Sequence, residues 1–116
     1  MGIPAYTRLK SNRDFGLVYR RGRYLPGRHV VLHTNRVKGD EVRLGVAVSR
    51  KVRGAVTRNR LKRRLREAFY RLDGEVKSGT DLILTAKEHA LDLPFDLLQA
   101  EIRGLLSRSE LLVHDR

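Results

Sequence analysis

Hydrophobic side chains recur at the spacing of an α-helix in three stretches of the chain, and each set would form one buried face. The first stretch runs from about Asn12 to Arg21, where Ser11 followed by Asp14 resembles a capping box and Gly22 ends the pattern. The three apolar faces consist of Phe15, Val18 and Tyr19; of Leu61, Leu65, Ala68, Phe69 and Leu72; and of Phe95, Leu98, Ile102, Leu105 and Leu106. The sequence therefore predicts three helices.

Start and stop signals set the limits of the second and third helices. Gly54 and Thr57 straddle the expected start of the second helix, which should end near Asp73 and Gly74. Pro94 stands where proline favours the first position of a helix, so the third helix should begin there.

Three other stretches predict strands. Arg28–Asn35 is rich in valine and alternates loosely, Val42–Ser49 alternates strictly, and Asp81–Lys87 is the compact apolar run of a buried strand. In the second strand, one face carries Val42, Leu44, Val46 and Val48, and the other Arg43, Gly45, Ala47 and Ser49. No repeat or linker divides the chain, so we expect one α+β domain over residues 1–116, with its helices packed on a single sheet.

Composition adds a strong charge to this fold. Hydrophobic residues make up 41% of the 116 positions, enough for one core, and the formal net charge is +12. This balance favours a polyanionic partner, which could be RNA, DNA or an anionic membrane surface. No apolar run approaches the roughly 20 residues of a membrane span, and the first ten residues lack the apolar stretch of a signal peptide. The absence of cysteine excludes disulfides and thiolate sites and fits a cytoplasmic location.

The charge is concentrated in residues 49–66, read SRKVRGAVTRNRLKRRLR, where no acid occurs. Nine of these positions are cationic: Arg50, Lys51, Arg53, Arg58, Arg60, Lys62, Arg63, Arg64 and Arg66. A block of this kind repels itself unless a polyanion lies against it. Because the second helix has an apolar face, we expect its other side to present guanidinium groups, whose planar forks match phosphate.

The second strand offers a different kind of surface. One of its faces carries only small residues beyond Arg43, namely Gly45, Ala47 and Ser49. If exposed, this face would leave a shallow groove, with the helix that carries Phe15 and Tyr19 as one wall. Aromatic rings beside such a groove suit unpaired bases. A Phe and a Tyr at i and i+4 of a short helix are also common core residues, so both interpretations stay open.

These segments together resemble the protein subunit of bacterial ribonuclease P. The resemblance is carried by Gly45–Lys51, read GVAVSRK, and by Ala55–Arg63, read AVTRNRLKR. The core of the second segment, Arg58-Asn59-Arg60, resembles the RNR motif of that family. Further segments match the family in order and spacing: Arg8–Lys10, Asp14–Phe15, Val18–Tyr19, Asp81–Leu84 and the last helix.

The resemblance implies a fold and a function. The family fold is a single α-β-β-β-α-β-α domain of the ribosomal protein S5 domain 2 type, with a mixed sheet. Its basic helix lies in a left-handed crossover between parallel strands, against the usual handedness. A short strand would lie near Arg23–Leu25. Members assist a catalytic RNA that removes the 5′ leader of precursor tRNA. The implied partners are therefore this RNA and precursor tRNA. The implied cofactor is Mg²⁺, which the RNA would bind for the most part.

The resemblance also implies two sets of site residues. The set that would contact the catalytic RNA is Arg53, Arg58, Asn59, Arg60, Lys62, Arg63 and Arg66. The set that would form a cleft for the leader is Phe15, Tyr19, His33, Ala47, Ser49, Arg50 and Lys51. His33 departs from the family pattern, in which an aromatic residue such as tyrosine is common at that position.

Some of these residues and segments have alternative roles. Asn59 could instead cap the basic helix. The four histidines show no metal-ligand spacing and the acids are scattered, so we expect neither a metal site nor catalytic residues in the protein itself. The alternative function is that of a structural RNA-binding protein of the ribosomal type, which charge and size fit equally well; a DNA-binding helix-turn-helix is less favoured. We expect a monomer, one copy per RNA, with no membrane partner.

Overall fold

The computed structural model describes residues 6–113, and its elements follow the predicted order with one added strand. The helices are α1 (Asn12–Arg21), α2 (Ala55–Tyr70) and α3 (Phe95–Arg108), with short 3-10 helices η1 (Asp73–Glu75) and η2 (Glu88–Asp92). The strands are β1 (Thr7–Arg8), β2 (Arg23–Pro26), β3 (Val30–Arg36), β4 (Val42–Val48) and β5 (Thr80–Ala86). The short β2 lies where the family resemblance implied a strand.

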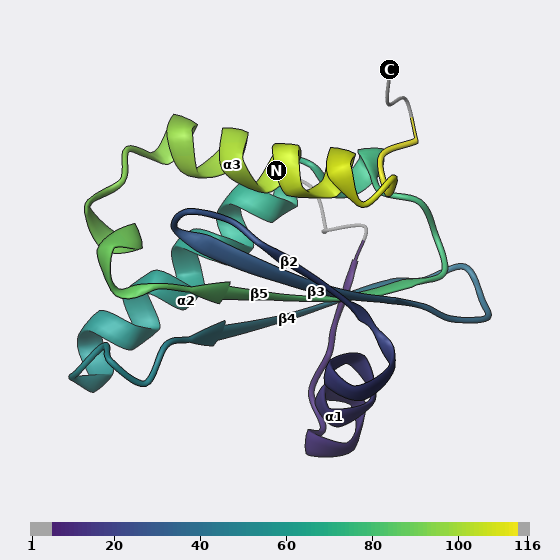
Figure 1. Cartoon of the computed structure of the whole chain (residues 1–116), viewed down its shortest axis with the longest axis horizontal. Helices are drawn as coiled ribbons and strands as arrows, with labels where there is room; N and C mark the ends of the chain where they lie inside the picture. Colours follow the sequence, from purple (N-terminus) through teal and green to yellow (C-terminus); the bar gives the residue numbers. More distant parts are fainter. Residues whose placement is uncertain (1–5, 114–116) are drawn as a thin grey trace.

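The five strands form one mixed sheet in the order β1-β4-β5-β3-β2. Strand β4 is parallel to both β1 and β5, whereas β3 is antiparallel to β5 and to β2. Helix α2 connects the parallel neighbours β4 and β5, which confirms the implied crossover; its left-handedness stays an expectation. Figure 1 shows α1 and α3 on opposite sides of this sheet.

The main core lies between one face of the sheet and the helices α2 and α3. The buried residues of α2 are Leu61, Leu65, Ala68 and Phe69, four of the five that helical spacing predicts. The fifth, Leu72, is also buried but lies just beyond the helix. The buried residues of α3 are Leu98, Ile102, Leu105 and Leu106. Both helices pack on alternate strand residues: Val30, Leu32, Val42, Leu44, Val48, Leu82, Leu84 and Ala86. Alternate residues of the strands therefore pack against residues that recur at helical spacing on α2 and α3.

Helix α1 covers part of the opposite sheet face. Its Val18 is buried against Leu9 and Ile83, so β5 contributes buried apolar residues to both of its faces. Phe15 lies on Gly45 of β4, where a Cβ atom would come within 2.5 Å of the ring atom Cζ. Any larger residue at position 45 would therefore require the Phe15 ring to move from its place on the sheet.

Polar contacts fix the start of α1. The backbone N–H of Asp14 donates to Oγ of Ser11 at 3.0 Å, which confirms the predicted cap. The Asp14 carboxylate accepts from Nη1 of Arg43 at 3.3 Å, and Arg43 also binds the buried Asp81 through two bonds of 2.8 and 2.6 Å. The hydrogen bond with Asp81 is the main reason why the pKa of Arg43 is raised. This network ties α1, β4 and β5 together.

The element limits differ slightly from the sequence expectations. The predicted strands differ from the observed ones by one or two residues at their ends, except that β4 starts at Val42 as predicted. Helix α2 ends at Tyr70, before the expected end near Asp73 and Gly74, and Pro94 is the N-cap of α3 rather than its first helical residue. Strand β1 was not predicted, because two residues are too short to carry a periodic signal. Within residues 6–113, no helix combines the length and apolar character that crossing a membrane requires.

Replacing Leu65 or Phe69 with alanine should lower the free energy of unfolding by roughly 2–5 kcal/mol, because each buried side chain would leave a cavity between α2 and the sheet. Urea unfolding followed by circular dichroism measures this change. Val56→Ala, on the same helix at a position that is 78% exposed, is the control and should change stability by less than about 0.5 kcal/mol. A Leu65→Ala protein as stable as the wild type would contradict the assigned face.

Candidate nucleic-acid interface

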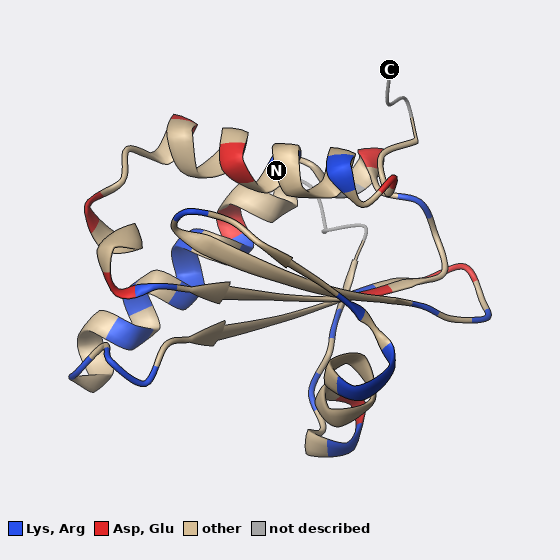
Figure 2. Cartoon of the chain, viewed as in Figure 1, with Lys and Arg blue, Asp and Glu red and all other residues tan. Residues whose placement is uncertain are grey.

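The core contacts of α2 leave the remaining helix surface to polar and charged residues. Asn59, Lys62, Arg63 and Arg66 follow the spacing i, i+3, i+4 and i+7, and so share a second face beside the buried one. Figure 2 shows Lys and Arg concentrated along α2 and in the loop that precedes it. The amphipathic division predicted from the sequence is therefore present.

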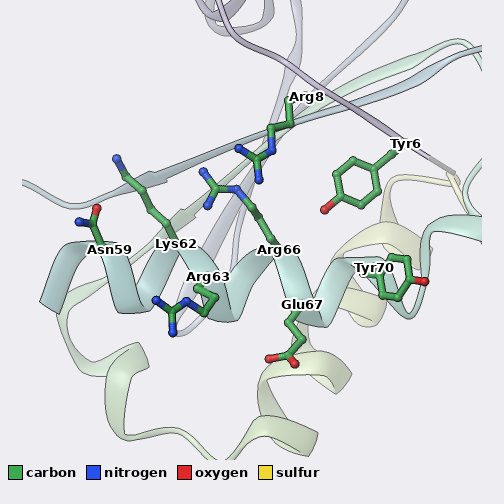
Figure 3. A pocket seen from close by; sticks show the side chains of 8 residues that line it. All are labelled: Tyr6, Arg8, Asn59, Lys62, Arg63, Arg66, Glu67 and Tyr70. Atoms are coloured by element: carbon green, nitrogen blue, oxygen red, sulfur yellow. The ribbon is translucent and has the colours of Figure 1, made fainter. Parts of the chain in front are cut away.

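The polar face of α2 forms one side of a groove of about 710 Å³, which we call the basic groove. Its lining residues are Tyr6, Arg8, Asn59, Lys62, Arg63, Arg66, Glu67 and Tyr70. Figure 3 shows the side chain of Arg8 extending from β1 toward Arg66 of α2. Four cations and one acid line the groove, so it carries a surplus of positive charge.

Arg8 and Arg66 place like charges near each other across the basic groove. Burial lowers the pKa of Arg66, and the charge of Arg8 lowers it further. The guanidinium group of Arg66 nevertheless stays protonated, because the ordinary pKa of arginine lies far above neutral pH. An anion bound between them would relieve the repulsion, and phosphate matches the donor geometry of a guanidinium group.

The predicted RNA-contacting set is only partly gathered in the basic groove. Four of its members line the groove, whereas Arg53 and Arg60 are exposed outside it. Asn59 is exposed in the second turn of α2, whose N-cap is Gly54 with a φ of +88°. The interpretation of Asn59 as a helix cap is therefore wrong, and its side chain is available to a ligand.

Arg58 differs from the other predicted RNA contacts because its guanidinium group turns toward the protein. Its Nη1 donates to the carbonyl oxygens of Ser49 (2.9 Å) and Val52 (3.0 Å), and its Nη2 to that of Val48 (3.2 Å). Arg64 is held in a similar way by the carbonyl oxygens of Ala90, Leu91 and Leu93. Both arginines thus belong to the fold, and a contact of Arg58 with RNA stays a prediction.

The residues predicted to bind a leader lie on the opposite face of the sheet, beside α1. Tyr19 is 46% exposed and meets His33 of β3 edge-to-face, with ring centroids 4.8 Å apart. The ring of Phe15 lies 6.4 Å from that of Tyr19 and is half-buried on Gly45. The interpretation as a core residue therefore applies to Phe15, which packs against the sheet. The interpretation as an exposed ring applies to Tyr19.

The same sheet face is only partly covered beyond these rings. The strand register places Ala47 of β4 beside Thr85 of β5, and Thr85 beside Val31 of β3, and all three are half-buried. We call these three residues the open strip. Ser49 follows at the end of β4, and Arg50–Lys51 are exposed in the next loop. The structure thus brings the predicted leader residues to one face and one end of the sheet.

His33 provides a neutral ring at the centre of the aromatic group. Burial lowers the pKa of His33, so its uncharged form is favoured at neutral pH. Its Nδ1 is buried and has no hydrogen-bond partner among the described residues. Tyr24 of β2 also contacts it, with ring centroids 5.1 Å apart, and is 62% exposed. An uncharged His33 with two exposed tyrosines extends the aromatic surface.

Tyr6, Arg8 and Tyr24 were not identified as site residues from the sequence. Pairing of Arg8 with Leu44 places the short β1 alongside β4, and this brings Tyr6 and Arg8 to α2. The only local signal was the segment Arg8-Leu9-Lys10, in which two cationic residues flank an apolar one. The structure shows that this Leu9 is buried. The position of Tyr24 follows from its pairing with His33, which no local pattern specifies.

Comparison with known proteins identifies a family with this architecture. The family model described as Ribonuclease P matches residues 3–110. The ribonuclease P protein component of Symbiobacterium thermophilum is 42% identical over 106 residues, which cover 90% of this chain and 92% of that protein. The component of Shouchella clausii is 35% identical over 106 residues, which cover 90% and 87%.

Solved structures of such proteins confirm the predicted fold class. The RNase P protein of Staphylococcus aureus superposes with a TM-score of 0.80 at 32% identity, covering 90% of this chain and 96% of that one. The RNase P protein of Thermotoga maritima gives a TM-score of 0.78 at 31% identity, with 87% and 96% covered.

If the basic groove binds phosphates, replacing Lys62 or Arg63 with alanine should weaken binding to a bacterial ribonuclease P RNA and flatten its salt dependence by about one ion. Fluorescence anisotropy at several salt concentrations measures the slope. Lys38→Ala, which removes one exposed charge from the β3–β4 turn, is the matched control and should leave the slope unchanged. An unaltered slope for Arg63→Ala would mean that this residue does not contact phosphate.

Proposed function

The chain belongs to the ribonuclease P protein family, and we propose that it is the protein subunit of a ribonucleoprotein endoribonuclease that removes the 5′ leader of precursor tRNA. The observation that carries this proposal is the basic groove, where residues of the RNR-motif helix and Arg8 of β1 face one another. The partner of this groove would be the catalytic RNA. The partner of the opposite sheet face would be the leader.

Binding of the catalytic RNA would be mainly electrostatic. The groove cations are arranged along one helix face, so they could contact successive phosphates of a folded RNA backbone and release its counterions. Asn59 adds a neutral donor and acceptor that could bind a ribose hydroxyl or a base edge. Recognition of this kind depends on the shape of the RNA more than on its sequence.

Leader binding would use a different chemistry. A leader is single-stranded, so its bases can stack on exposed rings such as that of Tyr19. The open strip has no large side chain, which leaves room for a nucleotide beside these rings. The exposed Arg50–Lys51 pair at the end of β4 could hold the leader phosphates. This surface is suited to binding many leader sequences with modest preferences.

The hydrolysis itself is assigned to the RNA. Within residues 6–113, no three His, Asp or Glu side chains lie close enough together to hold a metal ion. We place the Mg²⁺ on the RNA, where it would supply the hydrolytic chemistry. The contribution of the protein would be to hold the leader and to screen repulsion between two polyanions through its net charge of +12. We further propose a cytoplasmic monomer, one copy per RNA.

Cleavage of precursor tRNA at low Mg²⁺ tests the proposed function. We expect a bacterial ribonuclease P RNA to cut at the mature 5′ end when this protein is added, and the protein alone to cut nothing. If the protein adds nothing to an RNA that is active at high Mg²⁺, and binds that RNA no better than an unrelated one, a structural RNA-binding role is favoured instead. Cleavage by the protein alone would contradict the assignment of the chemistry to RNA.

Tyr19→Ala should weaken the binding of leader-bearing precursor to the reconstituted holoenzyme by about 5- to 150-fold, the range for loss of one base–aromatic stack. The affinity for leaderless tRNA should not change, because only the precursor reaches this face. Leu97→Ala removes another exposed apolar side chain, from α3 beyond the main core, and serves as the control. Equal losses for the two tRNAs would contradict leader binding at Tyr19. This variant is preferable to Phe15→Ala, which would also loosen the packing of α1.

A further inference from the structure

We propose that Arg58 is a positioning residue, which shapes the segment between β4 and α2 so that the cations facing the leader and those facing the catalytic RNA are presented together. The residues of the Arg58-Asn59-Arg60 motif would then have two different functions. Arg58 holds the protein segment, and its neighbours Asn59 and Arg60 remain exposed to RNA. The functional part of this inference rests on the function proposed above, whereas its structural part concerns the free protein.

The contacts of Arg58 span the whole turn that leads from the sheet into the helix. The carbonyl of Val48 closes β4, that of Ser49 starts the turn, and that of Val52 lies just before the helix. Two guanidinium nitrogens reach all three oxygens from the second turn of α2. The side chain therefore fixes the distance between the end of the strand and the helix that follows it.

Few other bonds hold this turn. The N–H of Val52 donates to the Ser49 carbonyl at 3.0 Å, and the N–H of Lys51 donates to Ser49 Oγ at 3.2 Å. The helix start adds no support of its own, because Gly54 supplies no side-chain cap and the first turn of α2 contains no acid. Without the guanidinium group, the path of residues 49–53 would rest on these short-range bonds, on the bond from the Ser49 N–H to the Ala86 carbonyl of β5 (2.9 Å), and on the buried Val52 side chain.

Both predicted binding surfaces include this turn. Ser49 and Arg50–Lys51 belong to the predicted leader set, and Arg53 belongs to the predicted RNA set. All three cations are exposed, so no side-chain packing fixes where their charges lie. Their placement follows from the backbone, and the backbone path depends on Arg58. Loss of Arg58 should therefore disturb both surfaces, although its guanidinium group is directed toward the protein.

Arginine suits this role and lysine does not. The planar fork of a guanidinium group places donors on two separate nitrogens, and an ammonium group carries all its donors on one. Lysine at position 58 would keep the positive charge but could not occupy the Nη1 and Nη2 positions together. The carbonyl acceptors are neutral, so in the wild type the charge of Arg58 also remains available to attract RNA. Substitution by lysine therefore separates positioning from charge.

The test compares Arg58→Lys and Arg58→Ala with Arg60→Ala, the matched control that removes an exposed cation two residues away. Hydrogen–deuterium exchange of the free protein reports the turn directly, at the amides of residues 49–53. We expect both Arg58 variants to accelerate this exchange by at least about tenfold, while protection of the β5 and α3 amides is retained. Arg60→Ala should leave the exchange unchanged.

The reconstituted holoenzyme then reports the functional consequence. Arg58→Lys should reduce the preference for leader-bearing over leaderless tRNA about as much as Arg58→Ala, and Arg60→Ala should weaken RNA binding without changing that preference. Unchanged exchange in residues 49–53, or full rescue of leader preference by lysine, would overturn the positioning role. If the wild type itself shows no leader preference, the proposed function fails and the exchange data alone decide the role of Arg58. If the variants do not fold, NMR of the wild-type Arg58 guanidinium protons decides: slow exchange supports the role and free rotation overturns it.

Discussion

The packing of α2 against the sheet is the constraint on which the arrangement of this protein depends. Leu61, Leu65 and Phe69 are buried almost completely, and this fixes the rotation of the helix about its own axis. Once that rotation is set, the residues at i, i+3, i+4 and i+7 from Asn59 can only face the groove beside β1. The hydrophobic effect thus holds a set of mutually repelling charges on one face of the helix.

Two arginines of the basic block are held by hydrogen-bond acceptors that do not neutralise their charge. Arg58 and Arg64 bind backbone carbonyl oxygens instead of carboxylates, so their side chains are ordered while the positive field is preserved. Arg43, by contrast, binds two carboxylates, those of the buried Asp81 of β5 and of Asp14 in α1. Within the basic block, Arg58 and Arg64 thus use neutral acceptors, whereas Arg43 uses carboxylates to join α1 to the sheet.

The two proposed binding surfaces differ because the two sheet faces differ. One face is filled by the apolar residues of α2 and α3, and the groove lies outside that core along α2. The other face is covered only in part by the shorter α1, which leaves exposed rings and the open strip beside it. A phosphate-binding groove and an aromatic surface for unpaired bases can thus lie on one small domain without competing for the same residues. The turn held by Arg58 connects them.

Much of this architecture was predictable from local pattern, as the α2 core face, the Ser11 cap and the alternating β4 illustrate. The family resemblance named the residues of both surfaces, and four of the seven predicted RNA contacts line one groove. The sequence could not indicate that Arg58 turns inward, because the same guanidinium donors can bind either a backbone carbonyl or a phosphate. Nor could it place Tyr6, Arg8 and Tyr24, whose positions depend on strand pairings between distant segments. Periodicity and charge, which are local properties, determined the elements and the kind of partner; contacts between segments far apart in the chain decided which cations are free to bind it.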